Sequence, residues 1–86
     1  MRNRRTSKFR KRFDRLPADV QEQAKASYRL FKKDPYYPSL HFECIDREES
    51  IWSTRIGLHY RAVGIKDGDT IFWFFIGSHE DYNHLL

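Results

Sequence analysis

Residues that can move protons follow the most apolar run of the sequence. Residues 71–76 read Ile-Phe-Trp-Phe-Phe-Ile, and Gly77-Ser78-His79-Glu80-Asp81-Tyr82 comes directly after them. Histidine gives and takes a proton near neutral pH, so His79 is a candidate general acid or base. Tyr82 lies three residues further on and shares the side of His79 if the segment is helical. The competing interpretation is that His79 caps a terminal turn or hydrogen-bonds the core.

Two arginines occupy matching positions in neighbouring predicted strands. Arg55 lies in one strand on the side of Ser53, and Arg61 lies in the next strand on the side of Val63 and Ile65. The planar guanidinium group offers a fork of donors that suits a phosphate, so Arg55 and Arg61 could hold one phosphate together. Alternatively, each arginine pairs with a carboxylate; the candidates are Glu43, Glu48 and Asp81.

The sequence predicts no metal and no cofactor. His79 and His84 are five residues apart with Asp81 between them, which is not a usual zinc spacing, and Cys44 is the single cysteine. There is no glycine-rich phosphate loop and no serine-nucleophile elbow.

Composition predicts a small globular protein. The chain has 86 residues, 40% hydrophobic and 16% aromatic, which favours one folded domain over residues 1–86 and excludes a disordered chain. One cysteine favours a reduced, cytoplasmic location. No apolar run approaches the length of a membrane span, so we expect no membrane association.

Positive charge is concentrated at the N-terminus. The formal net charge is +4, and eight of the first fifteen residues are Lys or Arg, against Asp14 alone. Such a cluster is typical of a surface that binds a polyanion. A solvated helix side, or a surface for an acidic protein, would explain it equally well.

Apolar spacing predicts two helices at the start of the chain. Phe9, Phe13 and Leu16 recur at helical intervals after a possible cap at Thr6 or Ser7. A second helix begins at Pro17 and ends before Asp34-Pro35, which resists helical geometry. We expect the two helices to pack as an antiparallel hairpin.

Alternating apolar residues predict strands in the second half. The strands are expected near residues 40–44, 51–56, 60–66 and 70–76, the last of them central, with a hairpin at Asp67-Gly68. Residues 80–86 could form one last helical turn. The predicted fold is α+β: two N-terminal helices on a three- to four-stranded antiparallel sheet, with a short C-terminal helical turn.

Three stretches carry a resemblance to a known family. They are FRKRFDRLPADVQEQAKASYRLFKKDPYYPSLHFE, then IWSTRIGLHYRAV, then DGDTIFWFFIGSHEDYNHLL. In the order of its elements, in the pattern W-S-x-R-I-G-x-x-Y-R-A and in the ending I-G-S-H-x-D-Y, the chain resembles the RelE/ParE toxin superfamily of bacterial type II toxin–antitoxin systems. The similarity runs from about Phe9 to Leu86.

The resemblance implies a function and a site. Many members are mRNA interferases that cut messenger RNA on the ribosome and inhibit translation, others act on DNA gyrase, and all are neutralised by an antitoxin. By position, Arg61, Arg55, His79 and Tyr82 match active-site residues of the RNA-cleaving members. Two features depart from the family pattern. Members usually open with a strand, for which residues 1–5 look too short and too charged, and Ser53 stands where RNA-cleaving relatives tend to have lysine.

Three functions remain open at this point. The first is a ribosome-dependent endoribonuclease, in which a 2′-hydroxyl attacks the adjacent phosphate. RNA-binding residues would then be Arg10, Lys11 and Arg12 of the basic helix, with His41 and Tyr60 near the site. The second is a gyrase poison, and the third is a relative that only binds its antitoxin. The expected partners are an antitoxin together with the ribosome and mRNA, or with gyrase.

Overall fold

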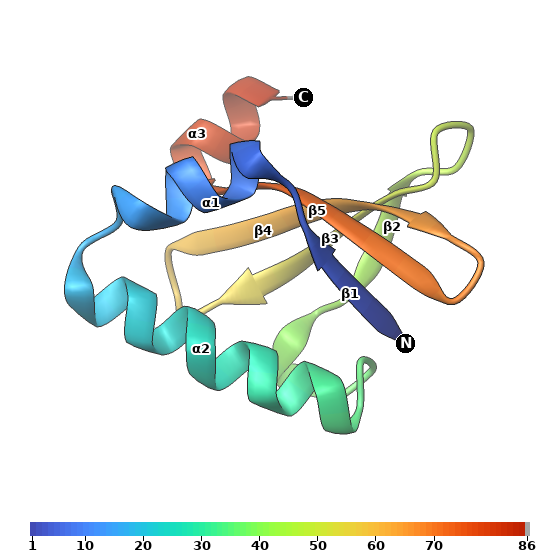
Figure 1. Cartoon of the computed structure of the whole chain (residues 1–86), viewed down its shortest axis with the longest axis horizontal. Coiled ribbons are helices and arrows are strands. Elements are labelled where there is room, and N and C mark those ends of the chain that lie inside the picture. Colours follow the sequence, from blue (N-terminus) through green and yellow to red (C-terminus); the bar gives the residue numbers. More distant parts are fainter. Residues whose placement is uncertain (86) are drawn as a thin grey trace.

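The computed structural model describes residues 1–85 and contains three α-helices and five strands (Figure 1). The predicted α+β class is confirmed. The last residue of the expected terminal turn, Leu86, lies outside the described residues. In chain order the elements are β1 (Arg2–Arg5), α1 (Ser7–Asp14), α2 (Ala18–Lys33), the 3₁₀ helix η1 (Pro38–Leu40), β2 (Glu43–Asp46), β3 (Ile51–Ile56), β4 (Tyr60–Asp67), β5 (Thr70–Ser78) and α3 (His79–Leu85).

The sheet has five strands in the order β1-β5-β4-β3-β2. The expected count of three to four strands was wrong, and so was the purely antiparallel arrangement, because β1 pairs with β5 in parallel. Strand pairing uses backbone groups, which every residue carries. The exposed side chains of Arg2, Arg4 and Arg5 can therefore extend into solvent while their backbone completes the sheet edge.

Two strand predictions need correction. The central strand is β4, and β5 lies between β4 and β1. The strand expected from residue 40 begins at Glu43, because Pro38 starts a 3₁₀ turn that buries Leu40. The Thr54 hydroxyl donates to the Leu40 carbonyl over 3.0 Å, which fixes this turn against β3. His41 follows with a positive φ of 46°, in the turn before β2.

One face of the sheet, here called the helix face, carries the main core. Trp73, Ala62 and Ile56 pack there with Ala24 and Phe31 of α2, and the Phe31 ring meets the Trp73 ring edge-on at 5.5 Å between centroids. Each large apolar side chain buried in this way contributes about 1.5–3 kcal/mol. Helix α1 packs mainly on β5 and α2 mainly on β3, rather than chiefly on each other as expected.

The opposite face, here called the open face, is covered only in part. Register and alternation place Arg55, Arg61, Val63 and Phe75 on it. Helix α3 covers one end through Tyr82, which packs on Val63 and Phe75. The other end is exposed: Phe72 and its strand partner Ile65 are 39% and 43% accessible. The last strand is therefore covered by helices on one face and by the C-terminal segment on part of the other.

Thr6 joins the first strand to the first helix. Its hydroxyl accepts from the backbone N–H of Phe9 over 3.3 Å, so the predicted N-cap is confirmed. The same hydroxyl donates to the Trp73 carbonyl over 2.9 Å. One side chain therefore caps α1 and ties it to β5 where β1 stops pairing.

Replacing Thr6 by valine is expected to destabilise the fold by about 1–2 kcal/mol, because valine keeps the shape but loses the cap and a hydrogen bond. Urea unfolding followed by circular dichroism measures this. Thr6→Ser, which keeps the hydroxyl, serves as the control and should lie close to the parent protein. Equal unfolding midpoints for Thr6→Val and the parent would contradict the assignment.

Candidate active site on the open sheet face

Arg55 and Arg61 lie directly opposite each other on β3 and β4. The Nε of Arg55 donates to the Gly57 carbonyl over 3.0 Å, and Nη1 of Arg61 donates to the Ser53 hydroxyl over 3.3 Å. These contacts orient the two guanidinium groups. They leave most of the donors of each group available for a ligand.

Neither arginine is neutralised within residues 1–85. The ion pairs of the described chain involve the N-terminus with Asp69 and Arg12 with Asp81, so the carboxylate pairing considered for Arg55 and Arg61 is not present there. Like charges directly opposite each other on a sheet are unfavourable. The strands thus hold two cationic groups side by side on one face, an arrangement that favours an anion between them.

Tyr82 and His79 extend this pair into a row. The Arg61 guanidinium carbon lies 5.2 Å from the centroid of the Tyr82 ring, within cation–π range. The Tyr82 ring in turn stacks against the His79 ring, with centroids 6.0 Å apart and planes 28° apart. The four residues matched to the family's active site, Arg55, Arg61, Tyr82 and His79, are therefore brought together by the fold.

The start of α3 positions the histidine. Its backbone N–H donates to the His59 carbonyl in the β3–β4 turn over 2.7 Å, which ties α3 to the sheet. The N–H of Asp81 donates to the Ser78 hydroxyl over 3.1 Å in the same turn of α3. The His79 side chain is exposed, whereas Tyr82 is buried. Tyr82 therefore forms the wall of the site, and the imidazole is free to meet a substrate.

Two further residues belong to this face. Ser53 is fully buried and accepts the hydrogen bond from Arg61. Glu43 pairs with Ser53 from β2 and exposes a carboxylate on the same face. From the sequence, Glu43 was considered only as a partner for an arginine. The strand register, which alternation alone could not give, places it in the site.

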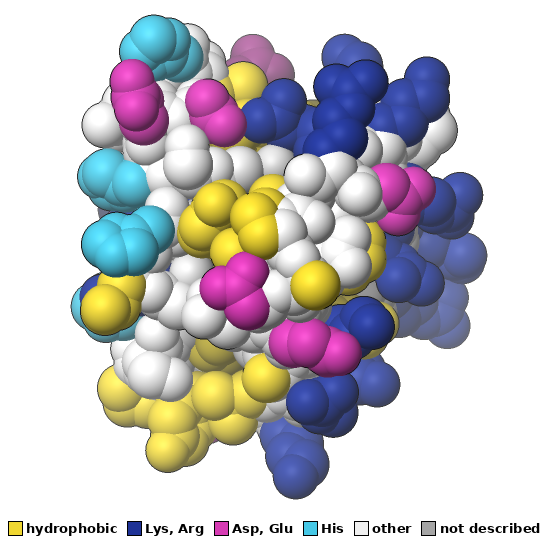
Figure 2. All heavy atoms as spheres, turned by 90° about the vertical axis from the view of Figure 1, so that its left-hand side faces the viewer, with side chains coloured by type: hydrophobic (Ala, Val, Ile, Leu, Met, Phe, Trp, Pro, Cys, Tyr) yellow, Lys and Arg dark blue, Asp and Glu magenta, His cyan; other side chains and the backbone are white. Residues whose placement is uncertain are grey.

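The remaining predicted residues are spread over the molecule. Tyr60 pairs with Ile56 and Ser78 and packs into the helix-face core, so it does not join the row. His41 is exposed in the turn before β2. Arg10 and Lys11 are exposed on α1, and Arg12 is partly buried. Figure 2 shows histidines along one side of the molecule and Lys and Arg crowded on the opposite side.

An apolar groove of about 420 Å³ lies between α1 and α2. Phe13 and Tyr28 line it from the two helices, and Trp73 lines it from β5. Arg10 and Lys25 are exposed residues that also line it. The groove exists because the two helices pack on different strands, and it combines an apolar lining with a rim on which Arg5, Arg10 and Lys25 outnumber Asp14.

Within residues 1–85, no three His, Cys, Asp or Glu side chains come together in a way that could hold a metal ion. Over the same residues, no helix is both long and apolar enough to cross a membrane.

The family model described as the ParE-like toxin domain matches residues 18–84. The chain belongs to this family, within the RelE/ParE toxin superfamily, as the resemblance indicated. It carries a ParE-like toxin domain, and membership of this toxin family implies an antitoxin partner. No curated protein is a significant match.

Solved structures show the same fold. A YoeB/ParE toxin from Agrobacterium tumefaciens superimposes with a TM-score of 0.68 at 20% identity, covering 92% of this chain and 99% of the other. A copper-bound point mutant of a toxin from Helicobacter pylori gives a TM-score of 0.64 at 18% identity, covering 94% of this chain and 97% of the other.

Proposed function

We propose that this protein, acting as one toxin domain over residues 1–86, is a ribosome-dependent endoribonuclease that cuts messenger RNA and so inhibits translation. The observation that carries the proposal is the continuous row of Arg55, Arg61, Tyr82 and His79 on the open face. It combines an exposed imidazole with two guanidinium groups that have no carboxylate partner within residues 1–85. These are the groups that phosphoryl transfer to a neighbouring hydroxyl requires.

The reaction would be attack of a ribose 2′-hydroxyl on the adjacent phosphorus. The 2′-oxygen loses its proton and bonds to phosphorus, and the bond to the 5′-oxygen breaks. The products are a 2′,3′-cyclic phosphate and a 5′-hydroxyl. His79 acts as the base that takes the first proton or as the acid that protonates the leaving oxygen. Arg61 and Arg55 stabilise the charge that develops on the phosphate oxygens, and Tyr82 positions the reacting groups.

The basic N-terminal surface would hold ribosomal RNA. Arg10 and Lys11 are exposed on α1. The row on the open face lies on β3, β4 and α3 rather than on α1, so the protein would bind ribosomal RNA through α1 and present the open face to mRNA. Binding of this kind weakens as salt rises, because each phosphate contact releases counterions. His41, exposed before β2, remains a candidate RNA contact.

A second candidate function is poisoning of DNA gyrase. The name of the matching family model, ParE-like toxin domain, favours it. Ser53 also stands where RNA-cleaving relatives tend to have lysine. In this function the row on the open face would perform no chemistry, and the basic α1 surface would contact gyrase or its DNA.

Inducing the protein in growing bacteria separates these functions. Under the ribonuclease proposal growth stops, amino-acid incorporation falls first and plasmid supercoiling is initially unchanged. Loss of supercoiling or DNA damage ahead of any fall in translation would favour gyrase. A soluble, folded protein that does not arrest growth would leave antitoxin binding as its role and overturn the proposal.

The apolar groove suits the antitoxin. We propose that an amphipathic acidic segment of the antitoxin occupies it, with its apolar side over Phe13, Tyr28 and Trp73 and its carboxylates near Arg10 and Lys25. The support is complementarity: an apolar groove with a positive rim fits a segment that is apolar on one side and negative at its borders.

Tyr28→Glu is expected to weaken antitoxin binding at least tenfold, because it places a charge in the apolar lining beside acidic groups. Isothermal titration with the antitoxin encoded beside the toxin measures the affinity. Tyr37→Glu is the matched control, since Tyr37 is exposed and does not line the groove. Equal affinities for the two variants would show that the antitoxin binds elsewhere.

A further inference from the structure

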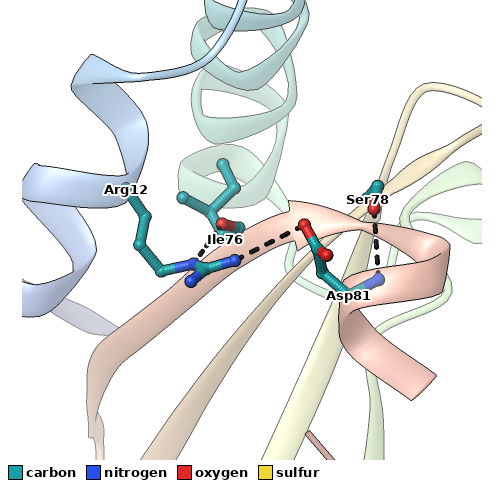
Figure 3. Close-up of polar contacts among 4 residues, drawn as sticks. All are labelled: Arg12, Ile76, Ser78 and Asp81. Atoms are coloured by element: carbon teal, nitrogen blue, oxygen red, sulfur yellow. Dashed lines mark hydrogen bonds and ion pairs between the residues drawn. The ribbon is translucent and has the colours of Figure 1, made fainter. Parts of the chain in front are cut away.

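Arg12 connects α1 to the end of β5 and to α3 (Figure 3). Its Nε donates to the Ile76 carbonyl over 2.9 Å. Its guanidinium carbon lies 4.3 Å from the centroid of the Phe75 ring, and Nη2 lies 3.6 Å from Oδ2 of Asp81. One side chain therefore contacts a strand backbone, a core ring and the C-terminal helix.

The position of Arg12 follows from the end of β1. Pairing between β1 and β5 runs only as far as Arg5 and Trp73. Beyond Trp73, no strand within residues 1–85 lies on this edge of β5, and α1 passes along it instead. The Arg12 guanidinium donates a hydrogen bond to the Ile76 carbonyl at this edge. This carbonyl would otherwise lack a protein partner on that side.

Gly77 leaves room for the guanidinium group of Arg12. A Cβ on Gly77 would lie 2.8 Å from Nη2 of Arg12 and 2.9 Å from Cζ of Phe75, too close for either atom to stay. Gly77 is the strand partner of Arg61. The glycine thus leaves room for Arg12 directly beside the site.

The segment that Arg12 holds contains two of the four site residues. Helix α3 has seven residues, too few to be stable without tertiary contacts. It is held by the burial of Tyr82, by the His79 amide on the His59 carbonyl, and by Arg12 at the β5–α3 junction. We expect that losing any of these contacts would let His79 and Tyr82 move relative to Arg61.

We propose that Arg12 is a positioning residue that holds α3 so that His79 and Tyr82 face Arg61, rather than a direct RNA contact as its sequence position suggested. Its effect on cleavage rests on the proposed function. Its hold on α3 does not. The hydrogen bond to Ile76 and the contact with Phe75 carry most of the effect, because they fix the end of β5, where Phe75 packs on Tyr82 of α3. The Asp81 carboxylate is 60% exposed and 3.6 Å away, and such pairs contribute little.

Arg12→Met tests the proposal, because methionine can still cover Phe75 but cannot donate a hydrogen bond. Arg15→Met removes the same charge from an exposed site at the end of α1 and is the matched control. NMR measures the amide hydrogen exchange of α3 and of α2 in both variants. Asp81→Asn is measured in the same way, to test the ion pair with Arg12 separately. We expect the α3 amides to exchange at least tenfold faster in Arg12→Met alone, with α2 unchanged. The assignment is overturned if the α3 amides of Arg12→Met exchange at the parent rate. It is also overturned if the α3 amides of Asp81→Asn exchange as fast as those of Arg12→Met.

Cleavage kinetics on mRNA-programmed ribosomes distinguish a positioning residue from a residue that contacts an RNA phosphate. If Arg12 is a positioning residue, the single-turnover rate at saturating ribosomes falls at least tenfold in Arg12→Met. The ribosome concentration that gives half of the maximal rate changes less than twofold, and Arg12→Lys does not restore the rate. Arg12 would instead be an RNA contact if Arg12→Met raises the half-saturating ribosome concentration without changing the maximal rate, and if Arg12→Lys brings that concentration back to the parent value. If the parent protein does not cleave, the proposed function fails, and the exchange result still decides whether Arg12 holds α3.

Discussion

Replacing His79 by alanine is expected to lower the rate of mRNA cleavage about 10²–10⁴-fold and to relieve growth arrest, because a positioned acid or base contributes that much to a rate. The substitution should leave the fold intact. The structural contact of His79 with the sheet is made by its backbone N–H to the His59 carbonyl, which alanine retains, and its side chain is exposed. Single-turnover cleavage on programmed ribosomes measures the rate.

His84→Ala is the matched control for this result. His84 is another exposed histidine of α3 and is not one of the four residues of the row. Its substitution should leave both cleavage and arrest unchanged. Growth arrest by His79→Ala as strong as that of the parent protein would remove His79 from the mechanism and favour a gyrase target.

Replacing Arg61 by methionine is the second large effect, with an expected loss of cleavage rate of about 10²–10³-fold. Removing one preorganised donor to a developing oxyanion typically costs this much. Stability should fall by about 1–3 kcal/mol, since the buried Ser53 hydroxyl loses the hydrogen bond from Arg61, and relief of the repulsion from Arg55 offsets part of this loss. The rate is measured as for His79, and thermal unfolding checks the fold.

Arg47→Met provides the comparison for Arg61→Met. Arg47 is exposed in the turn between β2 and β3, so its removal lowers the net charge equally without touching the row. Equal losses of activity in the two variants would mean that total charge, rather than a placed guanidinium, supports activity. Arg61→Lys should stay well below the parent, because an ammonium group lacks the planar fork of donors.

The row on the open face was predictable from short-range patterns. Alternation placed Arg55 and Arg61 on one face, and the Asp67-Gly68 turn fixed the hairpin that brings the end of β5 beside Arg61. The three-residue spacing of His79 and Tyr82 predicted their shared side once α3 proved helical. In each case the responsible interaction is local or follows from the two-residue period of a strand.

Features that depend on distant backbone partners were not predictable in this way. The charged residues Arg2–Arg5 form a strand because β5 offers them an edge, which no property of their side chains indicates. Arg12 looked like one more cation of the basic segment, whereas its carbonyl partner is 64 residues away in sequence. Tyr60 lies beside Arg61 in the chain but on the other face of the sheet, and only the register assigns it to the core.

The most direct test of the proposed function is to incubate the purified protein with ribosomes carrying a defined mRNA and to map the RNA ends. We predict cleavage that requires the ribosome, with a 2′,3′-cyclic phosphate on the upstream fragment and a 5′-hydroxyl on the downstream one, and no cleavage by His79→Ala. Intact mRNA after incubation with folded protein, combined with inhibition of DNA supercoiling by purified gyrase, would contradict the account.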